Sequence, residues 1–375
     1  MKNYLSILAF AAVSFCLICG GCQSDNVVED ESAAAQPNVG EADVKVERAV
    51  EPKAQAVVET KPPTRTSRSR RWSLYGDWEV KVDYDEWQME SILSFSRDSE
   101  GNQTGQWISF WGMNELKDIK FEDDKLSFVQ TYQGRDGQTR TSTFAGTVKD
   151  GKVSGTVSSD RGENKLEGKR SRRTARVAGN WEMKMKMGER EFTSTLVVTA
   201  GKAGKLGAEW QSERGEHEIT DVKYERGKLT FKRTSKMQDR QWESTFEGRL
   251  RRDTLSGVIK SERGDITAEG TLVGAALIGN WNLEVTSERG NRKQRLKVNP
   301  DMSGMYGAIP IEKFNLEDDQ VSFKTVLEFG ERKFEMSFEG KLAEAKLAGE
   351  LTTSRGTRKV TGTKVIRSFR GRRTR

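Results

Sequence analysis

The sequence predicts an all-β protein made of three tandem small antiparallel meander barrels, each of about eight strands. Three observations lead to this prediction. A Gly-x-Trp motif recurs through the chain, apolar and polar residues alternate over long runs, and glycine-rich turn signals separate these runs. A continuous antiparallel meander closes most economically into a barrel, because closure removes both sheet edges. A β-sandwich with the same strand order is the alternative.

The repeat is marked by three tryptophans, Trp78, Trp181 and Trp281, which stand 103 and 100 residues apart. The same landmarks follow each of them: an apolar-x-Phe triplet, a Phe-x-Gly triplet, a second glycine and an Arg-Gly pair. From the Phe-x-Gly triplet onward the spacing is the same in all three copies. The third copy is eight residues shorter in its first half. Ordered landmarks of this kind indicate threefold duplication of one unit.

The first strand of each copy is predicted from a period of two. In the first copy Trp78, Val80, Val82 and Tyr84 share one face, and polar or charged residues fill the positions between them. This alternation is typical of a strand with one buried face. The other two Gly-x-Trp segments alternate in the same way, so all three copies are expected to begin with such a strand.

Turns and strand glycines complete the pattern. Asp-Gly turns such as the one at Asp150 and Gly151 accommodate the positive φ that tight hairpins need. Further glycines recur inside the predicted strands, at Gly146, Gly155 and Gly168 in the first copy. Glycine inside a strand permits the strong coiling that a small barrel requires. We therefore expect these positions to be where the sheet bends.

The barrel interiors are expected to be filled. An eight-stranded barrel has room for its own side chains or for one small ligand. In the second copy fifteen mostly bulky residues are predicted to point inward, which favours a packed core over a lipid-binding cavity. These residues are Trp181, Met183, Met185, Leu196, Val198, Trp210, Val222, Tyr224, Leu229, Phe231, Trp242, Phe246, Leu255, Ile259 and Ile266.

A Gly-x-Trp motif on the first strand of an eight-stranded meander resembles the lipocalins and the wider calycin family. The resemblance implies a cation near the end of the last strand that packs over the tryptophan. Arg170 and Lys364 stand near that place in copies one and three, whereas copy two has Leu272. The resemblance also implies, as an alternative function, carriage of a small apolar ligand. The repeats are shorter than typical lipocalins, so a large cavity is not expected.

The N-terminus predicts a lipoprotein signal peptide over residues 1–21. Its apolar stretch, residues 5–18, is shorter than the roughly 20 residues of a membrane-spanning helix. The sequence Ile-Cys-Gly-Gly-Cys at 18–22 resembles a bacterial lipobox, in which Cys19 takes the place of the usual leucine. The resemblance implies that Cys22 carries diacylglycerol and further acyl chains such as palmitate, which together anchor stably. An ordinary secretory signal cleaved nearby is the alternative.

The remaining boundaries follow from composition. Residues 22–71 lack a sustained period and are poor in aromatics, so they are predicted to be a disordered tether. The β repeats are placed at 72–173, 174–274 and 275–366, and a basic tail at 367–375. The tail and the Arg-rich end of the tether either are solvated or contact anionic lipid or polysaccharide. The net charge of +7 is modest and the chain is expected to be exported, so nucleic acid is not an expected partner.

Composition argues against catalysis. All three cysteines lie in the first 22 residues and the chain has one histidine, His217. Disulfides, thiolate metal sites and histidine-dependent catalysis are therefore not expected in the folded part. No acid, base or nucleophile set recurs at matched spacing. We expect a protein that is not an enzyme, with no catalytic residues, metal or cofactor. His217 is interpreted as a surface loop residue, and the acidic triplets at 122–124 and 317–319 as turns.

Two aligned sets of residues are candidate ligand contacts. Arginines of the repeated Arg-Gly turns suit bidentate contacts with anionic sugars or phosphates, or else are simply solvated. Aromatics early in each unit suit stacking on a sugar ring at a barrel mouth, or else pack in the core. The arginines are Arg161, Arg263 and Arg355, and the aromatics are Trp107, Trp210 and Tyr306.

Together these features predict a lipid-anchored lipoprotein of the cell envelope, at the outer membrane or the periplasmic face. Its three β repeats are expected to act as a non-catalytic binding or structural module. The expected partners are envelope glycan or an envelope protein, with avidity from three linked copies. The triple arrangement is similar to repeat-bearing exported bacterial proteins that are uncharacterised as a class. Lipocalin-like carriage of a small apolar molecule is the alternative function.

Overall fold

The computed structural model describes residues 73–366, apart from 85–86, 135–136, 202–203, 214, 238–239, 288–289 and 330–331. The chain divides into two units, Met1–Thr66 and Ser67–Arg375, and all described residues lie in the second. The predicted signal peptide, Cys22, tether and basic tail fall outside the described residues. Within the described part, no helix is long and apolar enough to span a membrane.

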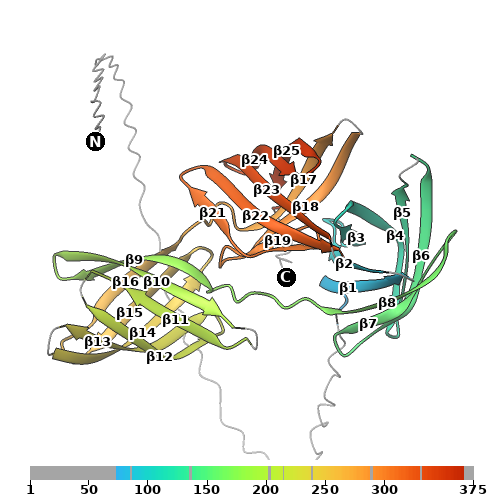
Figure 1. Ribbon diagram of the computed structural model, residues 1–375. Helices are drawn as coiled ribbons and strands as arrows, with labels where there is room; N and C mark the ends of the chain where they lie inside the picture. Colours follow the sequence, from blue (N-terminus) through green and yellow to red (C-terminus); the bar gives the residue numbers. More distant parts are fainter. Residues whose placement is uncertain are drawn as a thin grey trace, which may run out of the picture. The chain divides into compact units, whose positions relative to one another are not determined.

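The described residues form three antiparallel β bodies (Figure 1). The first is a closed barrel in which each strand pairs with the next and β8 returns to β1. This is the predicted up-and-down meander. Its strands are β1 (Gly76–Tyr84), β2 (Trp87–Arg97), β3 (Gln103–Ser109), β4 (Gly112–Glu122), β5 (Lys125–Gln133), β6 (Thr139–Lys149), β7 (Lys152–Ser159) and β8 (Gly162–Arg170).

The second body repeats this order, in an eight-stranded sheet that runs from β11 through β9 and β16 to β12. Its first and last strands pair with each other as in the first barrel. The strands are β9 (Gly179–Met187), β10 (Arg190–Ala200), β11 (Leu206–Gln211), β12 (Glu216–Glu225), β13 (Lys228–Met237), β14 (Arg240–Arg251), β15 (Thr254–Ser261) and β16 (Ile266–Leu272).

The third body is a nine-stranded sheet that runs from β20 through β17 and β25 to β21. Its shortened first half appears as three very short strands, as the missing eight residues require. The strands are β17 (Gly279–Ser287), β18 (Gly290–Val298), β19 (Gly304–Tyr306), β20 (Ile309–Ile311), β21 (Phe314–Glu317), β22 (Gln320–Phe329), β23 (Arg332–Ala343), β24 (Lys346–Thr353) and β25 (Gly356–Lys364).

Each body has its own hydrophobic core. The marker tryptophans are at most 1% exposed, and a stacked phenylalanine pair lies in every core. In the second barrel, the predicted inward residues belong to the core or pack against it. Trp242 is the exception: it is half-buried, and the guanidinium of Arg263 lies 5.2 Å from its ring centroid. The second core is therefore filled by the residues that the alternation selects.

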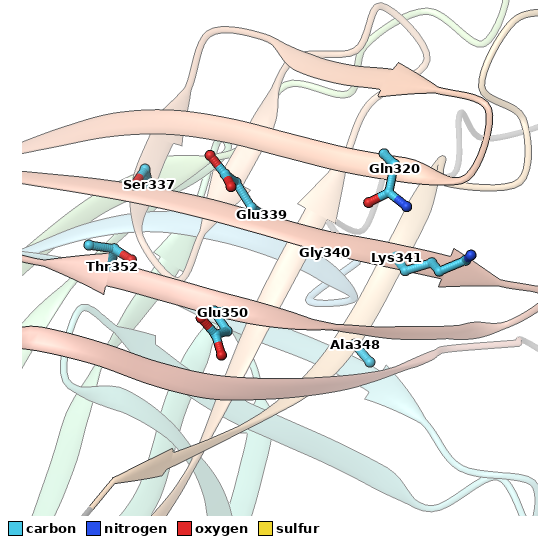
Figure 2. Close-up of a pocket in the computed structure, with 8 residues that line it drawn as sticks. All are labelled: Gln320, Ser337, Glu339, Gly340, Lys341, Ala348, Glu350 and Thr352. Carbon is cyan, nitrogen blue, oxygen red and sulfur yellow. The ribbon is translucent and has the colours of Figure 1, made fainter. Parts of the chain in front are cut away.

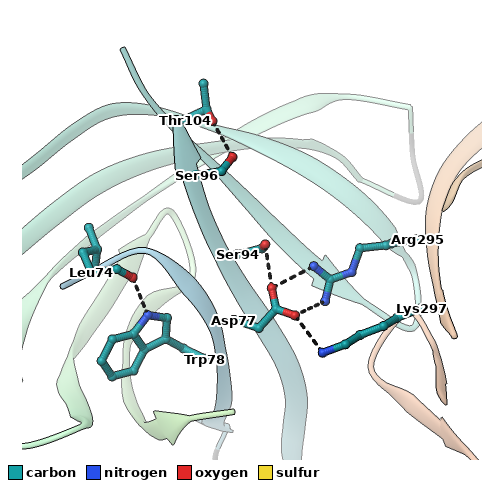
Figure 3. Close-up of polar contacts among 8 residues, drawn as sticks. All are labelled: Leu74, Asp77, Trp78, Ser94, Ser96, Thr104, Arg295 and Lys297. Atoms are coloured by element: carbon teal, nitrogen blue, oxygen red, sulfur yellow. Dashed lines mark hydrogen bonds and ion pairs between the residues drawn. The ribbon is translucent and has the colours of Figure 1, made fainter. Parts of the chain in front are cut away.

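The residues just before the first strand of each barrel pack into its core. The indole Nε1 of each marker tryptophan donates a hydrogen bond to the carbonyl four residues earlier, at 2.8, 2.9 and 2.8 Å. The residues that provide these carbonyls are almost completely buried. They are Leu74, Val177 and Leu277. The same bond thus recurs in all three barrels, and Figure 3 shows the one between Trp78 and Leu74.

The cation implied over the tryptophan is present in copies one and three. Arg170 pairs with Trp78 in register, and its Cζ lies 5.6 Å from the ring centroid. Lys364 occupies the same position opposite Trp281, with Nζ at 5.7 Å. In copy two the position holds Leu272, which is buried. The second barrel therefore uses an apolar contact where the other two use a cation–π contact.

The strand glycines act in facing pairs. Gly146 pairs with Gly155, and the other barrels repeat this with Gly248 opposite Gly257 and Gly340 opposite Gly349. A Cβ on Gly248 would stand 2.4 Å from Cζ of Phe246. The glycines therefore let two strands pass close to a core phenylalanine ring, which adds a packing reason to the predicted bending.

Candidate functional site

The aligned aromatics lie inside the barrels. They are 3%, 3% and 5% exposed, and each ring centroid is 6.1 to 6.3 Å from that of a core phenylalanine. They are Trp107, Trp210 and Tyr306, the last of which also lines a groove described below. All three rings therefore pack against phenylalanines of the cores.

The Arg-Gly pairs lie in equivalent exposed turns, β7–β8, β15–β16 and β24–β25. In each turn the arginine N–H donates to a Ser or Thr hydroxyl two residues earlier, at 3.2 to 3.3 Å. The glycine that follows has a φ between +104° and +112°, a conformation that favours glycine. The turn is therefore built by the hydroxyl and the glycine, and the side chains of Arg161, Arg263 and Arg355 are left exposed.

A groove of about 1480 Å³ is lined by residues of the first and third barrels. Its aromatic wall comes from the first barrel, with Trp87 at the start of β2 and Phe110 and Trp111 in the β3–β4 turn. Trp87 stacks on Tyr84 at 4.4 Å, and its centroid is 5.8 Å from that of Trp111. Trp111 is 39% exposed, so this wall presents an indole to solvent.

The third barrel contributes three arginines, called the arginine wall below: Arg292 on β18, Arg355 in the β24–β25 turn and Arg358 on β25. Burial and the like charge of Arg358 both lower the pKa of Arg292. Burial raises the pKa of Tyr306 to about 12, against the opposing effect of Arg292 and Arg358. The positive charges of Arg292 and Arg358 therefore both lie close enough to Tyr306 to favour its ionised form.

The groove arginines have no carboxylate partner among the described residues. Two glutamates line the same groove, and each pairs with a lysine instead. Glu90 is 2.9 Å from Lys81, and Glu328 is 2.9 Å from Lys333. The positive charge of the arginine wall is therefore not neutralised by ion pairs within the described structure.

Strand register shows that two of these arginines, Arg292 and Arg358, are specific to the third barrel. Arg292 pairs with Val285, and the second barrel has Phe192 at the equivalent place opposite Met185. The first barrel has Met89 there. At the position of Arg358, the second barrel has Ile266 and the first has Asn164. The third copy thus carries arginines where the second carries apolar residues.

A buried ion cluster joins the first and third barrels (Figure 3). Asp77 accepts hydrogen bonds from Arg295 at 3.1 and 3.4 Å and from Lys297 at 3.1 Å. Ser94 adds a hydroxyl donor at 2.7 Å. The side chains of Asp77 and Arg295 are 16% and 4% exposed. Burial alone would raise the pKa of Asp77, but the two cations and the Ser94 hydroxyl outweigh it and hold this pKa far below its usual range.

Apolar contacts surround this cluster. Ile92, Ile108 and Ala308 form a small buried core that draws on both barrels. The amide of Gln294 donates to the backbone carbonyl of Ser109 at 2.9 Å. Our sequence reasoning missed this junction, although the alternation signals it. Ile92 adjoins Leu93 along the strand, so one of two neighbouring apolar side chains must face outward.

A second hollow, of about 450 Å³, lies on the third barrel and is polar. Its residues lie on β22, β23 and β24, and Figure 2 shows them. Glu339 pairs in register with Glu350, and Lys341 forms a 2.8 Å ion pair with Asp319. This hollow differs from the groove in two ways. Its lining residues include no aromatic side chain, and its one lysine, Lys341, is already paired with Asp319. The groove is the stronger candidate site.

His217 is not in a loop, contrary to our interpretation. It lies on β12, is half-buried, and its ring nitrogens are 2.8 Å from Ser212 Oγ and 2.9 Å from Ser235 Oγ. Burial, followed by the positive charge of Arg233, lowers its pKa. Arg233 is 8% exposed, and its Cζ lies 4.7 Å from the ring centroid of Trp210. The charged neighbours of His217 along the chain hid the alternation of the strand.

Among the described residues, no group of three or more His, Cys, Asp or Glu is arranged to hold a metal ion. The acidic triplets lie in turns, where Asp123, Asp124 and Asp318 have positive φ. Asp tolerates that conformation better than most residues, so backbone geometry accounts for these residues without a ligand.

The chain matches no protein-family model, and no curated protein matches it. It has structural likenesses at 10–12% identity. One is to an outer membrane protein candidate from Bacteroides fragilis, with 12% identity, 52% of this chain and 96% of that chain covered, and a TM-score of 0.21. Another is to transferrin binding protein B from Haemophilus parasuis, with 11% identity, 78% and 76% covered, and a TM-score of 0.19.

A third likeness is to a protein of the DUF3598 family from Nostoc punctiforme. The identity is 10%, the coverage is 78% of this chain and 96% of that chain, and the TM-score is 0.19. No function is carried over from these three proteins.

Proposed function

We propose that the protein is a lipid-anchored lipoprotein of the cell envelope, placed at the outer membrane or the periplasmic face. Its three barrels act as a non-catalytic binding or structural module for envelope glycan or a protein partner. The observation that supports this most is that each barrel buries its own cluster of bulky side chains, whereas the copies differ from one another at the groove. A filled barrel offers its surface, rather than its interior, to a ligand.

The anchor is tested by metabolic labelling with an alkyne-bearing palmitate analogue. The expected result is a labelled full chain that partitions with membranes. Cys22→Ala should abolish the label, because the thioether forms on that sulfur. Cys19→Leu is the matched control: it introduces the usual lipobox residue and should keep the label. Equal labelling of the Cys22→Ala variant would show that the attachment site is wrong.

The binding role is tested with the full chain in detergent micelles. Capture on immobilised envelope glycan and crosslinking to envelope proteins are measured in parallel, with heat-unfolded protein as the control. Retention of the native chain on glycan, or one dominant crosslinked partner, is expected. Failure of both assays with natively folded protein would contradict the proposal.

A further inference from the structure

The groove between the first and third barrels brings together features that the second barrel lacks. The first copy supplies the aromatic cluster of Trp87, Phe110 and Trp111. The third copy supplies Arg292 and Arg358 at positions where the second has Phe192 and Ile266. Differences that arise separately in two copies of one unit, and that line one groove, indicate a binding surface.

We propose that this groove binds an acidic oligosaccharide, with sugar rings on the indoles and carboxylate or phosphate groups on the arginines. The inference rests on the proposed binding function and names its site and ligand class. Guanidinium forks bind both kinds of anion in a bidentate manner. Indole faces provide broad, rigid contact area beside a polar environment.

Charge supports an anionic ligand. Arg292, Arg355 and Arg358 lack carboxylate partners within the described structure, whereas the two lining glutamates are already paired with lysines. Arg355 is also held in place, because its Cζ lies 5.9 Å from the ring centroid of Phe334. An incoming anion therefore meets positive charge without displacing an acidic side chain.

The groove lining combines aromatic, apolar and hydroxyl side chains. Tyr306 lines the groove and is 5% exposed, and its ring centroid lies 6.3 Å from that of the core residue Phe323. Val285, Met336 and Leu351 also line the groove, and they belong to the core of the third barrel. Apolar side chains also line the groove, Ile309 and Leu327 among them, so the laurate probe below tests an alkyl chain directly. The wall above contains hydroxyl side chains, which suit a polar ligand: Ser287, Thr353, Ser354 and Thr357.

The test measures binding of sugar oligomers to the full chain in detergent micelles by titration calorimetry. The probes are hexagalacturonate, its fully methyl-esterified form, a phosphorylated oligomannose and laurate. The double variant Arg292→Phe with Arg358→Ile places the second barrel's residues in the third, so the barrel is expected to fold, as thermal denaturation checks. Arg263→Ala in the second barrel is the matched control for Arg355→Ala.

The expected result is binding of the carboxylated or the phosphorylated oligomer, and the two probes distinguish these anions. The double variant should bind roughly tenfold or more weakly, since each guanidinium provides a charge-assisted contact. Arg355→Ala should weaken binding and Arg263→Ala should leave it unchanged. Equal binding of the methyl ester, an unaffected double variant, or binding of laurate alone would overturn the inference.

The two proposals fail in different ways. If neither acidic oligomer binds but the chain still captures envelope glycan or a protein partner, this groove assignment is wrong and the proposed function stands. If capture fails as well, the proposed function is contradicted too.

Discussion

Facing glycines determine how closely the core phenylalanines pack against the strands. Phe246 stacks on Phe231 with centroids 4.8 Å apart, and its ring lies directly against Gly248. Gly257 faces Gly248, and a Cβ there would stand 2.6 Å from the Gly248 Cα. None of these strand glycines needs a positive φ, so space is the reason for their occurrence. The same arrangement in all three barrels makes it a property of the unit.

Gly248→Ala should therefore destabilise the second barrel by about 1–3 kcal/mol, the usual cost of adding a methyl group to a filled core. The control is Gly207→Ala on β11, where a Cβ would meet only the Thr199 hydroxyl, which can rotate. It should stay within about 0.5 kcal/mol of the parent. Chemical denaturation of the full chain measures both, and equal midpoints for the two variants would refute the packing account.

At the scale of the strand, the alternation of apolar and polar residues predicts most strands. It fails where charged residues surround a half-buried polar one. The first strand of each copy, the inward set of the second barrel and the shortened first half of the third all follow from sequence spacing. β12 was misread at His217, because Glu216 and Glu218 flank it and hide its buried face. The junction was missed for the opposite reason: Ile92 is apolar but faces away from its own barrel core.

β12 provides a prediction about pH. The folded-state pKa of His217 lies below its ordinary value of 6.5, because burial and Arg233 disfavour the imidazolium. Protons then bind the unfolded state first, so stability falls as the pH drops from about 6.5 through the folded-state pKa. Above that window the histidine is neutral in both states and has no effect.

His217→Gln keeps a side-chain amide for Ser212 or Ser235 and cannot titrate in this range. Its stability should vary less between pH 7 and 5 than that of the parent, by calorimetry of the full chain at each pH. Because the same acidic residues titrate in both proteins, the comparison isolates the histidine. Parallel stability curves for the two proteins would contradict this prediction.

At the scale of the whole described structure, equivalent positions of the three copies carry different residues where the first and third barrels meet. Asp77 occupies the middle of the Gly-x-Trp motif, where the other copies have Asn180 and Asn280. Arg295 occupies a β18 position equivalent to Ile92 on β2. Sequence alone predicted three barrels but could not predict which outward faces meet. Asp77 stands at the variable position of the Gly-x-Trp motif, Arg295 belongs to no motif, and the two lie more than two hundred residues apart in the chain.

Asp77→Asn should loosen the junction without unfolding either barrel, because the other copies fold with asparagine at that position. Leaving Arg295 buried without its partner costs about 3–5 kcal/mol. Hydrogen exchange should become faster in β18 and at the β3–β4 turn while the core strands stay protected. The control is Asn180→Ala, at the equivalent exposed position of the second barrel. Unchanged exchange in β18 would show that the cluster does not hold the junction.

The sign of the pH dependence follows from the depressed pKa of Asp77. The junction should be fully stabilised above the ordinary aspartate range and weaken as acid protonates the carboxylate. At neutral pH the cluster is therefore intact, and Asp77→Asn reproduces the effect of strong acid under mild conditions.

The glycine pairs have one further consequence. They bring two strands and a core ring into close contact in the middle of the sheet, away from the hairpin ends. Because the three copies share this core packing, residues at their turns and strand ends can differ from copy to copy without changing the fold. Exposed aromatic residues therefore occur at the turns of the first barrel and arginines on strands of the third, so that one groove combines side chains from two copies.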